Sequence, residues 1–181
     1  MGKSQSKQQT SKSSKPEDEK SNYVRFALVG SSGSGMSAFV NAVRGFCDLP
    51  GYGTPSYPDV ETYWRTLELE KFDRFLIFIS LRVTEPDLAL IKKVKSINKP
   101  FFLIRTKIDD NVECMKRKQK VVFKEEDLLL EIRNYILERT SHLSCAEEDI
   151  FIISNYDPRK WDFFSLIQAI INVMPAPEIG E

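Results

Sequence analysis

Four nearly continuous apolar segments recur along the chain, and each has the length of a short strand. Runs of this kind are typical of parallel strands that are covered on both faces. The segments are YVRFALVG (23–30), RFLIFIS (74–80), PFFLIRT (100–106) and DIFIIS (149–154).

Stretches with helical periodicity separate and follow these strands. A helix over 84–97 is predicted to begin at the N-cap Thr84, with Pro86 and Asp87 in its first turn and apolar Leu88, Ile91, Val94 and Ile97. A helix over 125–139 has an acidic first turn and an apolar face of Leu128, Leu129, Ile132, Tyr135 and Ile136. A helix over 161–174 ends before Pro175, and its predicted apolar face is Phe164, Ile167, Ile170 and Ile171.

Strands that alternate with helices imply βαβ units. The chain is therefore predicted to be an α/β fold of three layers around a mostly parallel sheet. In such folds, ligands bind at the carboxyl ends of the strands.

The composition mainly argues against certain ligands and locations. The chain has 181 residues, of which 41% are apolar, so one domain is expected. Its formal net charge is zero, and nothing in that balance points to nucleic acid. Cys47, Cys114 and Cys145 lie at unrelated spacings and His142 is the single histidine, which predicts free thiols and argues against a zinc site. No apolar run approaches the ~20 residues of a membrane span, and the start is not signal-like, so a cytoplasmic location is expected.

The first predicted strand ends in a phosphate-loop pattern. GSSGSGMS (30–37) matches GxxxxGK[ST], except that Met36 replaces the lysine. Backbone N–H groups of such a loop and the N-terminus of the following helix bind phosphate oxygens. Loss of the lysine ammonium should weaken phosphoryl transfer more than it weakens diphosphate binding. The alternative is a loop that binds no ligand. The predicted phosphate-binding residues are Gly30, Ser31, Ser32, Gly33, Ser34, Gly35, Met36 and Ser37.

Two further motifs follow the third and fourth strands and favour a guanine nucleotide. Thr106-Lys107-Ile108-Asp109 fits [NT]KxD. The Asp109 carboxylate can accept hydrogen bonds from the guanine ring N–H and the exocyclic amine, while the Lys107 stem packs over the base. Ser154 and Asn155 lie where backbone N–H groups would meet the guanine carbonyl. Each motif is at the carboxyl end of a predicted strand, as a nucleotide site requires.

With these motifs in place, the chain resembles the immunity-related, or interferon-inducible, GTPases from about Tyr23 to Pro175. The resemblance is carried by GSSGSGMSAFVNAVRG, DLPGYGTPSYP, KFDRF, FLIRTKID and IFIISN. It implies a P-loop NTPase fold, GTP or GDP with Mg²⁺ as ligands, and a regulatory branch of a defence family that acts at internal membranes with other family GTPases. It also implies Ser37 and Asp48 as magnesium-site residues, and Asp48 and Gly51 as switch II residues.

A segment of the family pattern is missing between the loop helix and DLPG. Residues 38–47 separate Ser37 from Asp48, and a helix of that length carries the chain about 15 Å away. A returning strand of ~5 residues is not present, so we expect that Asp48 does not reach the magnesium site and that Gly51 does not reach a γ-phosphate. The first strand then becomes a sheet edge. The alternative is a helix that unwinds early, so that VRGFC returns as a short strand and Phe39 is exposed.

The two ends of the chain are predicted to be tails of a domain that covers 23–175. Residues 1–22 contain almost nothing apolar, which predicts disorder, and 176–181 form a short C-terminal tail. MGKSQSK matches the myristoylation pattern with Gly2 as the acylated residue. Lysines at 3, 7, 12 and 15 would add attraction to anionic lipid. The alternative is a soluble tail without a lipid.

Three hypotheses follow for function. The first is a guanine-nucleotide-binding protein of this family with weak or absent GTP hydrolysis, peripheral on internal membranes. The second is an acylated interaction protein that needs no nucleotide and docks on full-length family members. The third is an unstable chain, because inner strands are missing. A basic segment, CMKRKQK (114–120), is expected to be a solvated loop.

Overall fold

The computed structural model describes residues 23–43, 46–118 and 123–175, so the two predicted tails lie outside the described residues. Within this range, four strands form one parallel sheet in the order of the sequence, and each lies inside a predicted apolar segment. The strands are β1 (Phe26–Gly30), β2 (Arg74–Ile79), β3 (Phe101–Arg105) and β4 (Ile150–Ile152).

Alternation of side chains along the strands divides the apolar residues between two faces of the sheet. Ala27 and Val29 of β1 face the same core as Phe75, Ile77 and Ile79 of β2. The residues between them, which include Leu28, Leu76 and Phe78, face a second core on the opposite side. Nearly every strand position is apolar because both faces are covered.

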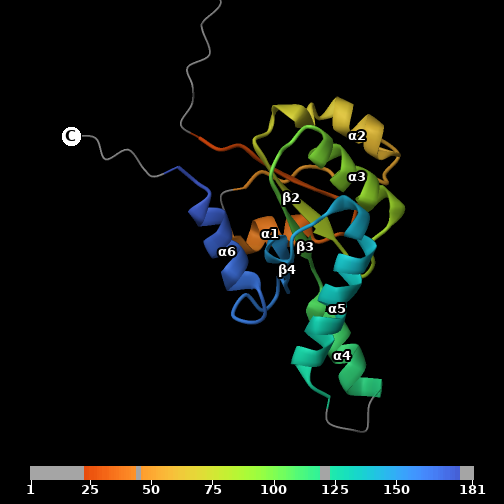
Figure 1. Cartoon of the computed structure of the whole chain (residues 1–181), viewed down its shortest axis with the longest axis vertical. Coiled ribbons are helices and arrows are strands. Elements are labelled where there is room, and N and C mark those ends of the chain that lie inside the picture. The colour runs from red at the N-terminus through yellow and green to blue at the C-terminus, as the bar shows by residue number, and fades with distance from the viewer. Residues whose placement is uncertain (1–22, 44–45, 119–122, 176–181) are drawn as a thin grey trace, which may run out of the picture.

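Helices complete a three-layer arrangement, and the fold class predicted from the sequence is confirmed (Figure 1). On one face lie α2 (Val60–Thr66), α3 (Glu85–Ser96) and α5 (Glu125–Arg139). On the other lie α1 (Met36–Val43) and α6 (Phe163–Asn172). Short 3₁₀ helices cover Leu69–Lys71, Ser141–Leu143 and Glu147–Asp149.

The helix over 84–97 begins as the sequence predicted. The Thr84 hydroxyl accepts from the Asp87 N–H, and the Asp87 carboxylate accepts from the Thr84 N–H at 2.8 Å, which is a complete capping box. The helix over 125–139 also has its predicted bounds.

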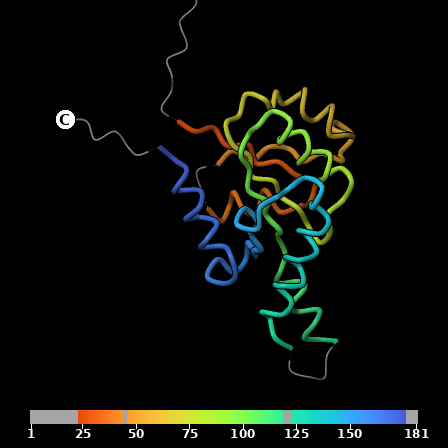
Figure 2. The backbone as a smooth tube through the Cα atoms, in the orientation of Figure 1, coloured from red at the N-terminus to blue at the C-terminus, as the bar shows by residue number. Residues whose placement is uncertain are grey.

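Two helices were not expected. The short α2 has Asp59 as its N-cap, since the Asp59 carboxylate accepts from the Thr62 N–H at 2.7 Å. The helix α4 (Ile108–Lys118) includes the first part of the basic segment, so the expectation of a loop there was wrong for 114–118. Figures 1 and 2 show α4 beside the start of α5, extending away from the sheet, and the Lys116 ammonium pairs with Glu125 at 2.9 Å.

The predicted apolar face of the last helix was correct for Ile167 and Ile170 and wrong for Phe164 and Ile171. Phe163, Leu166 and Ile170 of α6 pack into the core, whereas Phe164 and Ile171 are exposed. The helix is apolar on two adjacent faces, so periodicity alone allowed either choice.

β1 is an edge strand of the sheet. Among the described residues, no strand pairs with its outer edge, as expected from the missing family strands. A single bridge joins Ser31, just after β1, to Tyr52. None of the described helices combines the length and the apolar character needed to cross a bilayer.

Adjacent aromatic residues of α6 test its orientation. Phe163→Ala should lower the free energy of unfolding by about 3–5 kcal/mol, because it opens a cavity in the core. Phe164→Ala removes the same group from an exposed position and should change it by less than about 0.5 kcal/mol. Urea denaturation of both variants measures the difference, and equal losses would contradict the observed phase.

Candidate functional site

The predicted phosphate loop forms a tight turn between the end of β1 and the start of α1. Gly35 has a φ of 97°, a left-handed conformation that favours glycine. A Cβ at this position would also lie 3.1 Å from the Asn155 amide nitrogen and 3.2 Å from the Thr106 hydroxyl. The loop can therefore pass closely under two side chains that come from distant parts of the sequence.

Those two side chains hold the loop by its backbone. The buried Thr106 hydroxyl donates to the Ser34 carbonyl at 2.7 Å. The Asn155 amide donates to the Gly35 carbonyl at 3.0 Å. Because Thr106 follows β3 and Asn155 follows β4, the residues predicted to bind guanine and those predicted to bind phosphate meet at one end of the sheet.

Three buried side-chain oxygens in this region have no hydrogen-bond partner in the described part of the chain: Ser34 Oγ, Asn155 Oδ1 and Asp109 Oδ1. A buried polar atom without a partner is costly, so clusters of such atoms call for an explanation. Asp109 lies in the first turn of α4, at the position predicted to select guanine. Its unpartnered oxygen is an acceptor that no group in the described part of the chain satisfies.

The TKID turn is supported by an arginine that the sequence analysis did not single out. The Arg105 guanidinium donates to the Thr106 carbonyl and, at 2.7 Å, to Asn111 Oδ1 on α4. Burial lowers the pKa of Arg105 to about 10, which still leaves it protonated at neutral pH. Lys107 can then occupy a left-handed conformation, with a φ of 61°, and its side chain lines the site.

Ser154 is placed differently from Asn155. It is fully buried, and its hydroxyl accepts from the Tyr156 N–H at 3.1 Å. Ser154 therefore shapes the turn after β4, while Asn155 contacts the phosphate loop and Tyr156 lines the hollow beside it.

Met36, in the lysine position, is only 5% exposed and packs with Leu28 and Phe39 in the core beneath the loop. No ammonium is available there to reach a phosphate. The loop keeps its backbone N–H groups and the helix N-terminus but lacks the charge that bridges phosphates in lysine-containing loops.

The expectation that Asp48 cannot reach the loop serine was wrong. The Ser37 hydroxyl donates to the Asp48 carboxylate at 2.5 Å. The helix α1 ends at Val43, so it rises only about 9 Å beyond Ser37 at 1.5 Å per residue. Five residues to Asp48 are enough to return. Early unwinding is not needed either, because Phe39 lies inside α1 and is fully buried.

The segment after Asp48 also lies against the loop. The Tyr52 N–H donates to the Gly30 carbonyl at 3.1 Å, and the Ser32 N–H donates to the Tyr52 carbonyl at 2.8 Å. A Cβ on Gly51 would lie 2.7 Å from the Ser32 nitrogen. Gly51 therefore lies against the loop, just past the end of the β1 edge that the missing strands leave open. The expectation that it does not reach a γ-phosphate stays a prediction.

Tyr52 connects this segment to α3 through a contact that no sequence pattern indicated. Its hydroxyl donates to the carboxylate of the buried Asp87, the same residue that caps α3. Burial, and next the negative charge of Asp87, raise the pKa of the Tyr52 phenol well above its usual range. The Tyr52 phenol is therefore protonated at neutral pH and can donate to Asp87.

A hollow of about 400 Å³ lies between the phosphate loop and the segment 48–51, where the chain returns to the loop after α1. It is lined by residues 32–38 and 48–51 and by Lys107 and Tyr156. If Mg²⁺, which takes six ligands, were bound here, Ser37 and Asp48 would offer it two oxygen groups. Among the described residues, no group of three or more acidic, cysteine or histidine side chains could hold a metal ion, so phosphate and water oxygens would have to complete the magnesium shell.

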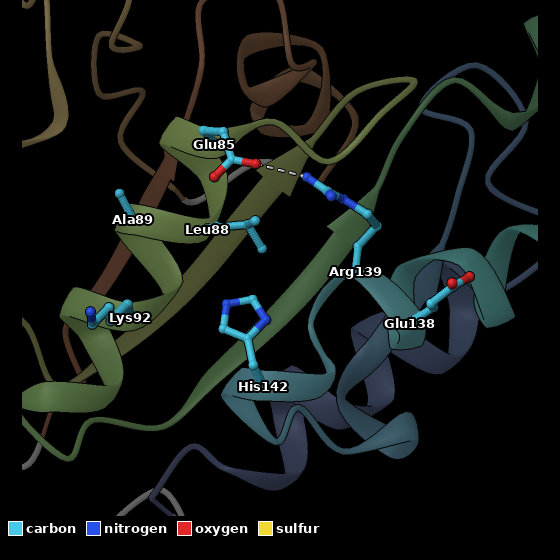
Figure 3. Close-up of a pocket in the computed structure, with 7 residues that line it drawn as sticks. All are labelled: Glu85, Leu88, Ala89, Lys92, Glu138, Arg139 and His142. Atoms are coloured by element: carbon cyan, nitrogen blue, oxygen red, sulfur yellow. Dashed lines mark hydrogen bonds and ion pairs between the residues drawn. The ribbon is translucent and has the colours of Figure 1, made fainter.

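A second hollow, of about 500 Å³, lies between α3 and the end of α5 (Figure 3). Charges of both signs surround its apolar floor at Leu88, and the Glu85 carboxylate already pairs with Arg139 at 3.0 Å. It contains none of the unpartnered buried oxygens, so it offers a ligand less than the site at the phosphate loop does.

The fold is that of the G domains of P-loop GTPases. A probable GTP-binding protein EngB matches 82% of this chain and 97% of its own, with a TM-score of 0.55 and 14% identity. The G domain of the T. maritima FeoB iron transporter matches 82% of this chain and 97% of its own, with a TM-score of 0.51 and 17% identity. At these identities the likeness defines the fold alone.

The chain belongs to the interferon-inducible GTPase (IIGP) family, whose model matches residues 45–178. Interferon-gamma-inducible GTPase 10 of Mus musculus is 25% identical over an alignment of 185 positions. The alignment covers 84% of this chain and 44% of the mouse protein. Interferon-inducible GTPase 5 of Rattus norvegicus is 26% identical, over 84% of this chain and 40% of the rat protein. The chain thus spans less than half the length of these relatives.

Proposed function

We propose that this chain binds guanine nucleotides at the phosphate loop and the TKID turn. The observation that carries the proposal is the meeting of the two motifs: Thr106 and Asn155 hold the loop, and Asp109 beside them keeps a buried carboxylate oxygen free. A carboxylate accepts from both guanine donors, whereas adenine presents an acceptor at its ring nitrogen and would repel it. Guanine is therefore favoured over adenine.

The phosphates of the nucleotide would bind the backbone N–H groups of the loop and the N-terminus of α1. Mg²⁺, when present, would neutralise phosphate charge beside Ser37 and Asp48. Because Met36 supplies no charge, this chain's own residues stabilise the transferred phosphoryl group poorly, and we propose weak GTP hydrolysis or none.

Exchange of one acceptor for a donor tests guanine recognition. Asp109→Asn should weaken GDP binding by about tenfold to a hundredfold, because the new amide N–H cannot accept from the guanine amine and one charge-assisted hydrogen bond of ~1.5–3 kcal/mol is lost. The same variant should gain affinity for xanthosine diphosphate, whose carbonyl replaces the guanine amine and accepts from the new amide. Calorimetry with both nucleotides measures the switch.

The neighbouring Asp110→Asn variant is the matched control, because Asp110 is exposed on the same helical turn. It should bind GDP as the unmodified chain does. If neither variant alters the preference between the two nucleotides, or if the unmodified chain binds no GDP, the proposed function is wrong.

Restoration of the loop lysine tests the role of Met36. A Met36→Lys stem can follow the buried path of the methionine while its ammonium enters the hollow that Met36 lines. Single-turnover GTP hydrolysis should rise at least about tenfold, which is the effect of one charge-assisted contact of ~1.5 kcal/mol. Met174→Lys adds the same charge at an exposed position and should leave the rate unchanged. A folded Met36→Lys protein with no gain would show that the missing ammonium does not limit the reaction.

We further propose that the protein acts in cell-autonomous defence, peripheral on internal membranes and together with other family GTPases. The support is the family membership and the start of the chain, where Gly2 fits acylation and four lysines precede the first acidic residue. One myristoyl chain binds bilayers only marginally, so both signals are needed.

Vesicle flotation of protein made with N-myristoyltransferase tests the membrane proposal. The acylated chain should float with vesicles that contain anionic lipid, and Gly2→Ala should remain in solution, since it cannot be acylated. Equal flotation of the two would contradict a role for the acyl chain.

A further inference from the structure

The geometry points to Tyr52 as a positioning residue that holds the returning segment, Phe46–Tyr52, closed on the phosphate loop and thereby favours GDP over GTP. The inference rests on the proposed nucleotide site and assigns a function to the Tyr52–Asp87 contact, which the sequence did not predict. Tyr52 itself touches no part of the nucleotide in this proposal. It acts through the positions of Gly51 and Ser32.

The segment is fixed to the loop by main-chain hydrogen bonds at a single point. Tyr52 exchanges bonds with Gly30 and Ser32, and the bond from the Ser32 N–H is the shorter, at 2.8 Å. Phosphate loops bind anions with backbone N–H groups of this kind. As long as the Tyr52 carbonyl accepts from Ser32, that N–H is not available to a phosphate oxygen.

Gly51 also occupies the space beside Ser32. The Gly51 α-carbon is so close to the loop that even a methyl group on it would lie 2.7 Å from the Ser32 nitrogen. A nucleotide whose first two phosphates lie along the loop and the start of α1 needs no room there. A third phosphoryl group that approaches Ser32 needs the room and the N–H together.

The anchor of the segment is buried and well supported. Asp87 is 2% exposed, and its carboxylate accepts from the Tyr52 hydroxyl through one oxygen and from Thr84 through the other. The Tyr52 ring also contacts the Tyr63 ring on α2, with centroids 5.7 Å apart. Opening the segment would remove the phenol from this carboxylate and leave a buried charge short of a donor, which is unfavourable.

Consequently GTP must break the Tyr52–Asp87 contact or bind with its third phosphate displaced, whereas GDP need do neither. In GTPases with an intact switch region, the segment moves freely enough to sense the γ-phosphate. Here it is bridged to the chain just after β1, and Tyr52 connects it to α3.

Removal of one hydroxyl tests the inference. Tyr52→Phe keeps the ring and its contact with Tyr63 but cannot donate to Asp87. The ratio of the Kd for a non-hydrolysable GTP analogue to the Kd for GDP should fall about fivefold, the factor that a net hydrogen bond of ~1 kcal/mol supplies. The Kd for GDP should change by less than about twofold.

Tyr57→Phe is the matched control. The Tyr57 ring contacts Tyr63 at the same 5.7 Å centroid distance, but within the described residues its hydroxyl has no recorded hydrogen bond. This variant should leave the ratio of the two dissociation constants unchanged.

Hydrogen exchange in the absence of nucleotide separates the contact from the ligand. The Ser32 and Tyr52 amides should exchange about fivefold faster in Tyr52→Phe than in the unmodified chain, and no faster in Tyr57→Phe. If GDP binds but neither the ratio nor the exchange rates respond to Tyr52→Phe, the inference is overturned while the proposed function stands. If GDP does not bind at all, both fail.

Discussion

Two hydrogen bonds, from Thr106 to the Ser34 carbonyl and from Asn155 to the Gly35 carbonyl, join parts of the chain that are 72 and 120 positions apart. They are possible because β1, β3 and β4 are parallel strands of one sheet, so that the turns after them emerge at the same edge. The Thr106 contact is buried and the Asn155 contact is partly buried, and together they fix the loop before any ligand arrives. The chemistry proposed for the site depends on this tie, because a loop of small residues would not hold its N–H groups in register by itself.

The missing strands alter the site in a way that depends on the path of the chain rather than on the motifs. With β1 at the edge, the stretch before and after DLPG lies beside it. Phe46 contacts Phe26 on one side, and Tyr52 pairs at the end of the strand. This arrangement covers part of an edge that would otherwise expose unpaired backbone groups. It also brings Asp48 and Gly51 to the loop, although the chain lacks the elements that deliver them in a full G domain.

The sequence predicted the strands well because each is a continuous apolar run between polar turns, and it predicted α3 from its capping box. It failed at α4, a mostly charged helix with only Ile108 and Val112 buried, and at Phe164 and Ile171 of α6, which is apolar on two faces. The motif residues could be placed at one end of the sheet from their order alone. The Tyr52–Asp87 contact could not, because two residues 35 positions apart meet only through the path of an edge segment. The reach of Asp48 was misjudged because a helix of ten residues after Ser37 was assumed, whereas α1 ends at Val43, six residues after Ser37.

The groups lost from this G domain and those that remain fall on different parts of a nucleotide. In the proposed binding mode, the lysine position and the room beside Ser32 concern a third phosphate, whereas Asp109, Asn155 and the N-terminus of α1 concern the base and the first two phosphates. A site with this asymmetry can gain stability from a bound diphosphate even where it catalyses nothing. A ligand at a hundred times its Kd stabilises the folded chain by about 2.7 kcal/mol, a sizeable share of the ~5–15 kcal/mol that holds a typical domain folded. For a sheet of four strands with an open edge, nucleotide binding would then contribute to maintaining the fold as well as to its function.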